Sequence, residues 1–194
     1  MKLFVATDVH GSAYWADRIV EQFNRSNCDM LILLGDVYNH GPRNPFPRDY
    51  QPMTVAKTFN KIADKIVAVK GNCDSEVDEM ISEFPFVAHQ VIPLGGRRLY
   101  FTHGHVYNKG NLPKLSRGDV LFYGHFHKNE MEVVNGVLCV NVSSVSLPKD
   151  VPSFCIVDDK GATLYGFNET DGGMNGGVNL LGCGNKVILQ KNFE

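Results

Sequence analysis

The stretch LFVATDVHG, residues 3–11, decides the fold of this chain, because it joins an apolar run to two polar side chains and a glycine. Residues 3–7 are typical of a buried strand, and an amphipathic helix is predicted to begin at about Ser12. Residues 30–34 predict a second buried strand. A strand, helix and strand in this order favour an open sheet whose strands run parallel.

The alternation continues through a helix and a third strand, at residues 66–69, and then changes to hairpins with glycine or asparagine turns. The strands predicted for the second half, which is mostly antiparallel, are 87–94, 98–102, 120–123, 130–134, 137–140, 154–157 and 162–167. We therefore expect an α/β fold of two packed sheets with helices outside.

Size and composition are those of a globular protein with one domain: 194 residues, of which 43% are hydrophobic and 21% charged. We expect residues 1–168 to form this domain and the glycine-rich residues 169–194 to be a loosely attached extension, not a separate domain. A formal charge of −2 indicates no capture of long nucleic acid. Five scattered cysteines and short apolar runs favour a cytoplasmic protein without disulfides, without a thiolate zinc site and without a membrane span.

Side chains able to bind metal ions follow five of the predicted strands. They are Asp8 and His10, Asp36, Asn72, His103 and His105, and His125 and His127. Because the carboxyl ends of parallel strands line one crevice, we expect Asp8, His10, Asp36 and Asn72 to lie together. Residues i and i+2 of an extended segment point to the same side, so we expect Asp8 with His10, and His125 with His127, to act as pairs.

Each of these motifs has a structural explanation when taken alone, such as a turn or a helix cap. The coincidence of five motifs, and the cost of burying two imidazoles without a metal or a carboxylate, favour a metal site. Carboxylate, amide and imidazole ligands without thiolate suit Mn²⁺, Fe²⁺, Ni²⁺ or Zn²⁺. There are too many such ligands for one ion.

The motifs DVH (8–10), GDV (35–37), GNCD (71–74), THGH (102–105) and GHFH (124–127) resemble, in order and spacing, those of the calcineurin-like metallophosphoesterases. The stretches GDVYNHGPRN, GNCDSEVD and VSLPK are similar to the small YfcE-type phosphodiesterases within that family. The resemblance covers residues 1–168. It implies a two-sheet αββα sandwich that hydrolyses phosphoesters with two divalent metal ions, with manganese expected first and nickel, iron or zinc as alternatives.

The family's arrangement also implies how the ligands divide between the ions. One ion would be held by Asp8, His10, His127 and a shared Asp36. The second would be held by Asp36, Asn72, His103 and His125. A hydroxide bridging the two ions would attack phosphorus. Asn72 is expected to be catalytic as well, and His105 to serve either as the general acid or as a partner of a ligand.

The chain departs from the wider family at two motifs. Cys73 stands where many members have a histidine, and a neutral thiol is a poor general acid, which predicts a preference for good leaving groups such as aryl or nucleoside phosphates. The alternative is a small, well-packed residue. The stretch NVSSVSLPK replaces an Asn-Pro-Gly-Ser run, and there Asn141 is expected to orient His127 or another ligand.

Other polar residues have weaker signals. His40, Arg43 and Arg48 lie in the proline-rich loop after the second motif and either contact substrate or are ordinary loop residues. His89 lies far from any motif and is expected to be structural.

Three functions are compatible with these patterns. The first is a phosphodiesterase acting on a small phosphodiester substrate. Both a monomer and a homo-oligomer are compatible with this function. The second is a phosphomonoesterase or nucleotidase, which would need additional cationic side chains. The third is a non-catalytic scaffold similar to a retromer subunit, which the complete ligand set argues against.

Overall fold

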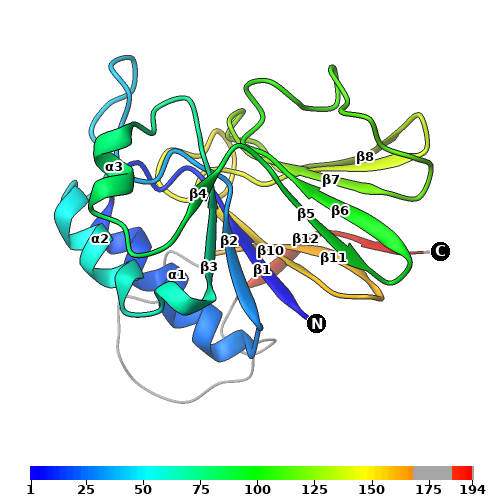
Figure 1. The fold of residues 1–194 in the computed structure, drawn as a ribbon, viewed down its shortest axis with the longest axis horizontal. Coiled ribbons are helices and arrows are strands. Elements are labelled where there is room, and N and C mark those ends of the chain that lie inside the picture. The colour runs from blue at the N-terminus through cyan, green and yellow to red at the C-terminus, as the bar shows by residue number, and fades with distance from the viewer. Residues whose placement is uncertain (168–184, 194) are drawn as a thin grey trace.

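The computed structural model describes residues 1–167 and 185–193, which form two sheets packed face to face with helices outside one of them (Figure 1). The first sheet contains β1 (Leu3–Ala6), β2 (Met30–Leu33), β3 (Ile66–Val69), β4 (Phe86–Val87), β10 (Ser153–Val157), β11 (Gly161–Gly166) and β12 (Lys186–Asn192). The second contains β5 (Gln90–Leu94), β6 (Arg97–Phe101), β7 (Val120–Tyr123), β8 (Glu130–Val134) and β9 (Val137–Asn141). The expected two-sheet α/β architecture is confirmed.

The first sheet is parallel where its strands alternate with helices. Its order is β12-β11-β10-β1-β2-β3-β4, and β1 to β4 are parallel neighbours. The helices are α1 (Ala13–Ser26), α2 (Pro52–Asn60), α3 (Glu76–Met80) and the short 3₁₀ helix η1 (Ala63–Lys65). Every residue of β1 is buried, because Phe4 and Ala6 pack under the helices while Leu3 and Val5 pack between the sheets. A strand with two buried faces must be apolar throughout, as this one is.

The second sheet has the order β5-β6-β7-β9-β8 and is parallel at its centre. The strand pairs β6-β7 and β7-β9 are parallel, although antiparallel pairs at both edges match the expected pattern. The parallel centre brings the ends of β6 and β7 to the same edge. In the part of the chain that the structure describes, the outer face of this sheet is covered by the segment 107–115, which packs on Tyr100 and Tyr123, and not by a helix.

Strand β12 was not expected from the sequence. It pairs antiparallel with β11 at the edge of the first sheet, and its Ile188 and Leu189 pack on the core between the sheets. We propose that it belongs to the same domain as residues 1–167. The expectation of a loosely attached glycine-rich segment falls mainly on residues 168–184, which lie outside the described residues.

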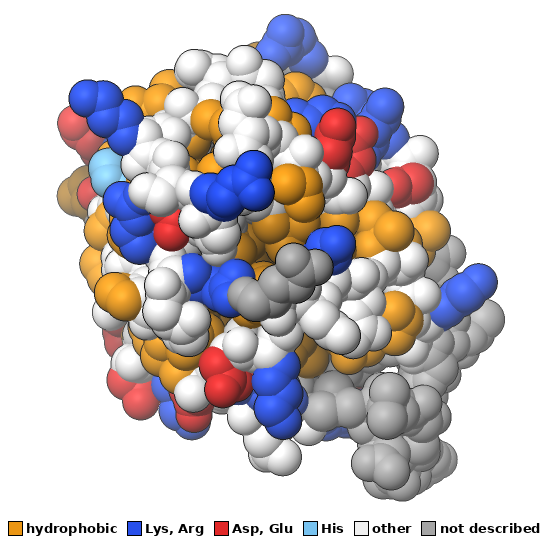
Figure 2. All heavy atoms as spheres, turned by 90° about the vertical axis from the view of Figure 1, so that its right-hand side faces the viewer, with side chains coloured by type: hydrophobic (Ala, Val, Ile, Leu, Met, Phe, Trp, Pro, Cys, Tyr) orange, Lys and Arg blue, Asp and Glu red, His pale blue; other side chains and the backbone are white. Residues whose placement is uncertain are grey.

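The surface away from the helices has a mixed character. Figure 2 shows Lys and Arg side chains interspersed there with acidic and apolar side chains. Among the described helices, none has both the length and the apolar character that a membrane crossing needs.

Candidate metal centre

The expected ligands lie together where five strands end. Asp8 follows β1, Asp36 follows β2 and Asn72 follows β3, while His103 follows β6 and His125 follows β7. The packing of the two sheets brings the two groups of strand ends to one place, so that His103 of the second sheet contacts Asp36 and Asn72 of the first.

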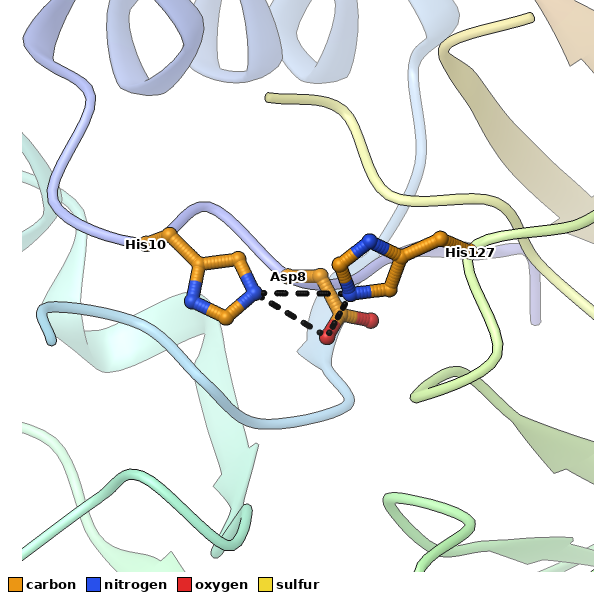
Figure 3. A group of neighbouring side chains, drawn as sticks. All are labelled: Asp8, His10 and His127. Carbon is orange, nitrogen blue, oxygen red and sulfur yellow. Dashed lines mark hydrogen bonds and ion pairs between the residues drawn. The ribbon is translucent and has the colours of Figure 1, made fainter. Parts of the chain in front are cut away.

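A first cluster is formed by Asp8, His10 and His127, whose side chains point toward one another in Figure 3. His127 Nε2 lies 3.2 Å from Asp8 Oδ1, and His10 Nε2 lies 3.5 Å from the same oxygen. The two Nε2 atoms are 3.5 Å apart. All three residues are buried.

A second cluster surrounds His103, which is fully buried. Its Nε2 lies 3.0 Å from Asn72 Oδ1, 3.2 Å from His125 Nδ1 and 3.5 Å from Asp36 Oδ2. Asn72 is exposed and His125 is half-buried, so this cluster is the more open of the two.

Asp36 lies between the clusters. Its Oδ2 is 3.5 Å from His103 Nε2 in the second cluster and 3.9 Å from His10 Nε2 in the first. A ligand atom of Asp36 also lies within 4.8 Å of those of Asp8 and His103. Asp36 thus lies within reach of both clusters.

The hydrogen bonds of the histidines fit metal ligation. Nδ1 of His10, His103 and His127 lies 2.8, 2.7 and 2.7 Å from the backbone carbonyl oxygens of Asn39, Leu34 and Leu147. A carbonyl only accepts, so each Nδ1 donates its proton and each Nε2 is left to face the cluster. Metal-bound histidines are held in this way.

The first cluster favours a positive charge. Nε2 of His10, Nε2 of His127 and Oδ1 of Asp8 lie within 3.5 Å of one another, and either a proton or a divalent ion among them stabilises this arrangement. Imidazole with carboxylate is a donor set that suits manganese, iron, nickel and zinc. The donor set therefore fits the metal chemistry expected from the sequence.

The charges of the site shift its pKa values. Burial would raise the pKa of Asp8, but hydrogen bonds from His10 and His127 outweigh burial and hold this pKa well below its ordinary value. Burial would lower the pKa of His103, yet the hydrogen bond to Asp36 and the charge of Asp8 raise it to about 9. Both directions show that the centre favours positive charge beside its two carboxylates.

The backbone at the ligands is left-handed and not extended as expected. The φ angles are 55° for Asp8, 50° for His10, 52° for Asp36, 66° for His125 and 58° for His127. His125 and His127 consequently face different clusters. His125 Nδ1 faces His103, whereas His127 Nε2 faces Asp8.

Asp74 is a buried residue of the site whose role was not anticipated. Its carboxylate accepts hydrogen bonds from the backbone N–H groups of Asp36 and Gly71, both at 2.7 Å, and of Val37 at 2.8 Å. It thereby fixes the loop that carries Asp36. Burial and the charge of Asp36 raise the pKa of Asp74 to about 6, against the opposing effect of these N–H donors. Asp74 is the last residue of the GNCD motif, so the motif was the feature of the sequence from which its role could have been inferred.

Three hydroxyl groups donate hydrogen bonds to Asp8, and the sequence motifs did not predict them. Thr7 Oγ1 donates to Asp8 Oδ2 at 2.6 Å. The hydroxyls of Ser144 and Ser146 donate to the Asp8 backbone oxygen at 2.8 and 2.9 Å. The carboxylate and the backbone of Asp8 are thus both held by neighbouring residues.

Asn141 does not orient His127, contrary to expectation. Its side-chain oxygen is buried without a hydrogen-bond partner, and the carbonyl of Leu147 holds His127 Nδ1 instead. His105 is exposed, with its ring centroid 5.3 Å from that of His103, and burial and the charge of His103 lower its pKa.

The remaining candidates divide between packing and the pocket. His89 stacks on Tyr100 with ring centroids 5.0 Å apart, which is a structural role. His40 packs against the ring of Phe46 at 4.4 Å. The guanidinium carbon of Arg48 lies 3.6 Å from the centre of the Tyr14 ring.

A pocket of about 440 Å³ opens over the ligands. The candidate ligands Asp36, Asn72, His125 and His127 line it together with Cys73. The rest of the wall comes from Asn39, Gly41, Pro42, Arg43, Asn44 and Lys149. Arg43 therefore faces the pocket, and Arg48 of the same loop does not line it.

Comparison with known proteins identifies the family. The calcineurin-like phosphoesterase superfamily domain matches residues 1–161. Phosphodiesterase YfcE of Escherichia coli (strain K12) is 43% identical over 172 residues, which are 87% of this chain and 94% of that protein. The solved structure of Yfce, a phosphoesterase from E. coli, matches with a TM-score of 0.89 and 38% identity over 100% of both chains.

A more distant structure shares the fold alone. Wild-type Vps29 from Entamoeba histolytica, solved in complex with Zn²⁺, matches with a TM-score of 0.56 and 19% identity over 100% of both chains. The domain match over most of the chain and the 43% identity of a curated relative show the family. The chain belongs to the calcineurin-like phosphoesterase superfamily.

Proposed function

We propose that this protein is a phosphodiesterase that hydrolyses small phosphodiesters with two divalent metal ions. The observation that carries the proposal is the convergence of seven potential ligands in two clusters, with Asp36 between them and its Oδ2 facing a histidine of each cluster. The relative that is 43% identical is named a phosphodiesterase, which supports the same substrate class.

Two ions at this centre, Mn²⁺ first and Ni²⁺, Fe²⁺ or Zn²⁺ as alternatives, would supply a bridging hydroxide and neutralise the phosphoryl oxygens. Asp8, His10, His127 and Asp36 would hold one ion, and Asp36, Asn72, His103 and His125 the other. The protein's own side chains would orient the metal ligands and the substrate. Asp74 and the hydroxyl groups around Asp8 hold the two carboxylates in place, and exposed Asn72 is placed to contact the substrate as well.

Neither Cys73 nor His105 is well suited to donate a proton to the leaving group. Burial and the charge of Asp36 raise the pKa of the Cys73 thiol to about 12, so it is a weak acid at neutral pH. His105 is exposed and lies nearest His103, at the edge of the second cluster. The proposed enzyme therefore prefers substrates whose leaving groups need no acid.

The described cysteines are free, which agrees with the proposed cytoplasmic location.

Phosphomonoester hydrolysis is the second candidate. It is favoured by Arg43 and Lys149, two cationic side chains in the pocket wall that could balance the additional charge of a monoester. A non-catalytic scaffold would not need the complete and braced ligand set found here.

The test uses the full chain, stripped with a chelator and reloaded with Mn²⁺. Hydrolysis of bis(p-nitrophenyl) phosphate is compared with that of p-nitrophenyl phosphate, and Asp36→Asn is the matched variant. Manganese-dependent turnover of the diester that exceeds that of the monoester and is lost in the variant is the expected result. Faster monoester turnover would favour the second candidate, and failure to bind metal would favour the scaffold.

A further inference from the structure

We propose that Arg43 and Lys149 bind a second phosphate group of the substrate, next to the phosphodiester that reacts. The natural substrate would then be a hydrophilic phosphodiester with a phosphate on the part that enters the pocket, in contrast to an ester whose remaining part is aromatic. The inference rests on the proposed function and specifies the substrate class for that site.

The pocket is larger than the reacting group requires. Its volume of about 440 Å³ lies within the range of pockets that hold whole small molecules, roughly 300–1,000 Å³. The reacting phosphoryl group belongs at the candidate ligands. The other lining residues come from the loop 39–44 and Lys149; this part of the lining, called the outer wall, is left to contact the rest of the substrate.

The outer wall is cationic and polar. Arg43 and Lys149 are exposed, and neither takes part in an ion pair among the described residues. The pocket lining contains one carboxylate, that of Asp36, which belongs to the ligand clusters. Among the described residues that line it, Pro42 and Cys73 are the least polar side chains, and the only aromatic rings are the two ligand imidazoles. Such a wall suits an anionic group of the substrate better than an aryl group or a nucleobase.

The segments that carry the two cations are both attached to ligands. The Asn39 carbonyl accepts the Nδ1 proton of His10, and within the loop the Asn39 side chain accepts from Gly41 N at 2.8 Å. The backbone N–H of Lys149 donates to the carbonyl of His127 at 2.9 Å. The positions of Arg43 and Lys149 relative to the reacting centre are therefore set by the fold.

The loop 39–44 also has little freedom to move. Asn44 closes it through its backbone N–H, 3.2 Å from Gly41 O, and through its side chain, 2.9 Å from His40 O. Gly41 has φ +76° and packs so tightly that a Cβ there would lie 3.0 Å from Cys73 Sγ. A loop fixed in this way presents its arginine without a large ordering cost on binding.

The chemistry of the two side chains suits a phosphate. A guanidinium binds two phosphate oxygens at once, and an ammonium adds a compact charge. Hydrogen bonds between charged partners of this kind change affinity by about tenfold to a hundredfold each. Because both side chains are exposed to solvent, we expect each to change affinity by about tenfold.

The experiment compares two substrates that differ only in the second phosphate. They are the p-nitrophenyl phosphodiester of trimethylene glycol and the same compound phosphorylated on its free hydroxyl, assayed with the Mn²⁺-loaded full chain. We expect the phosphate to raise kcat/KM by about tenfold or more. Arg43→Gln and Lys149→Gln each reduce this ratio, and the double variant brings it near one. Arg48→Gln, in the same loop but stacked on Tyr14, retains the wild-type ratio.

A wild-type ratio near one, or a ratio that survives in the double variant, overturns the inference. Equal losses on both substrates also overturn it, because they place the cations on the reacting phosphoryl group. If neither substrate turns over, the proposed function has failed, and calorimetry with trimethylene glycol bisphosphate and monophosphate decides the inference separately. Tighter binding of the bisphosphate that is lost in the double variant supports it, and equal binding of the two compounds refutes it.

Discussion

Replacing Gly71 with alanine tests whether the position of Asp36 governs both stability and activity. A Cβ at Gly71 would overlap Oδ1 and N of Asp36 and would lie 3.0 Å from its Cγ. Gly71 does not have a positive φ, so the alanine backbone itself is not strained. Asp36 cannot move away freely, because its N–H donates to Asp74 and its Oδ1 accepts from Cys73 N at 2.8 Å.

The expected magnitude follows from this overlap. Overpacking of one methyl group costs about 1–3 kcal/mol. In a domain of this size each kcal/mol lowers Tm by about 2–4 °C, so Gly71→Ala should lower Tm by about 2–12 °C. A shift of about 1 Å in a positioned group costs roughly a hundredfold in rate, and we expect a loss of that order in kcat/KM for an aryl phosphodiester.

The assay combines calorimetric Tm with and without chelator, Mn²⁺ content and kcat/KM. Gly110→Ala is the matched control, since Gly110 also has no positive φ and its added Cβ would lie 3.2 Å from the Asn108 side-chain oxygen alone. We expect the control to stay within about 0.5 kcal/mol of the wild type. Wild-type Tm and activity in Gly71→Ala would refute the steric reasoning. A lower Tm with full activity would refute the role of Asp36 as the shared ligand.

Three further predictions concern single groups. Because the pKa of Cys73 is raised to about 12, Cys73→Ala should slow aryl diester hydrolysis far less than the ~10²-fold expected on removing a general acid, and a hundredfold loss would show that the thiol acts in the reaction. The folded-state pKa of His103, raised from 6.5 to about 9, implies stability that is fully present below pH 6.5 and is lost as pH rises through 9. The Tm of the chelated protein should therefore fall across this window, less so after Mn²⁺ loading, and a flat profile would contradict the shift. Thr7→Val removes the donor to Asp8 and should weaken Mn²⁺ binding by about 10–100-fold in a metal titration, whereas unchanged affinity would show that Asp8 is held without it.

The parallel part of the first sheet and the proximity of most candidate ligands could be predicted because their signals are local. An apolar run such as residues 3–7 reads as a strand by itself, and the polar residues after it then fall at a known edge of a parallel sheet. Strand β12 could not be predicted in the same way. Its sequence, KVILQKN, has an apolar run of only three residues, which follows the glycine-rich segment, and it becomes a strand by pairing with the edge of β11.

The second sheet was harder because strand order is a long-range property. Hairpin signals correctly indicate β5-β6 and β8-β9, but β6, β7 and β9 are joined as parallel neighbours by segments with no helical pattern. The same limit applies to Asp74 and to Asn141. Both lie within motifs of the sequence, yet their contacts differ: three backbone N–H groups donate to the Asp74 carboxylate, whereas the Asn141 side-chain oxygen has no hydrogen-bond partner.

The left-handed backbone explains how these strand ends hold two clusters. Among the described residues, eight that are not glycine have positive φ, and five of these are the candidate ligands Asp8, His10, Asp36, His125 and His127. Each such conformation costs roughly 1–2 kcal/mol and persists where surrounding contacts over-determine it. Here it turns His125 toward the second cluster while His127 reaches the first, which one extended segment would not do. Bound ions would offset this strain, so metal binding and fold stability should be coupled in this protein.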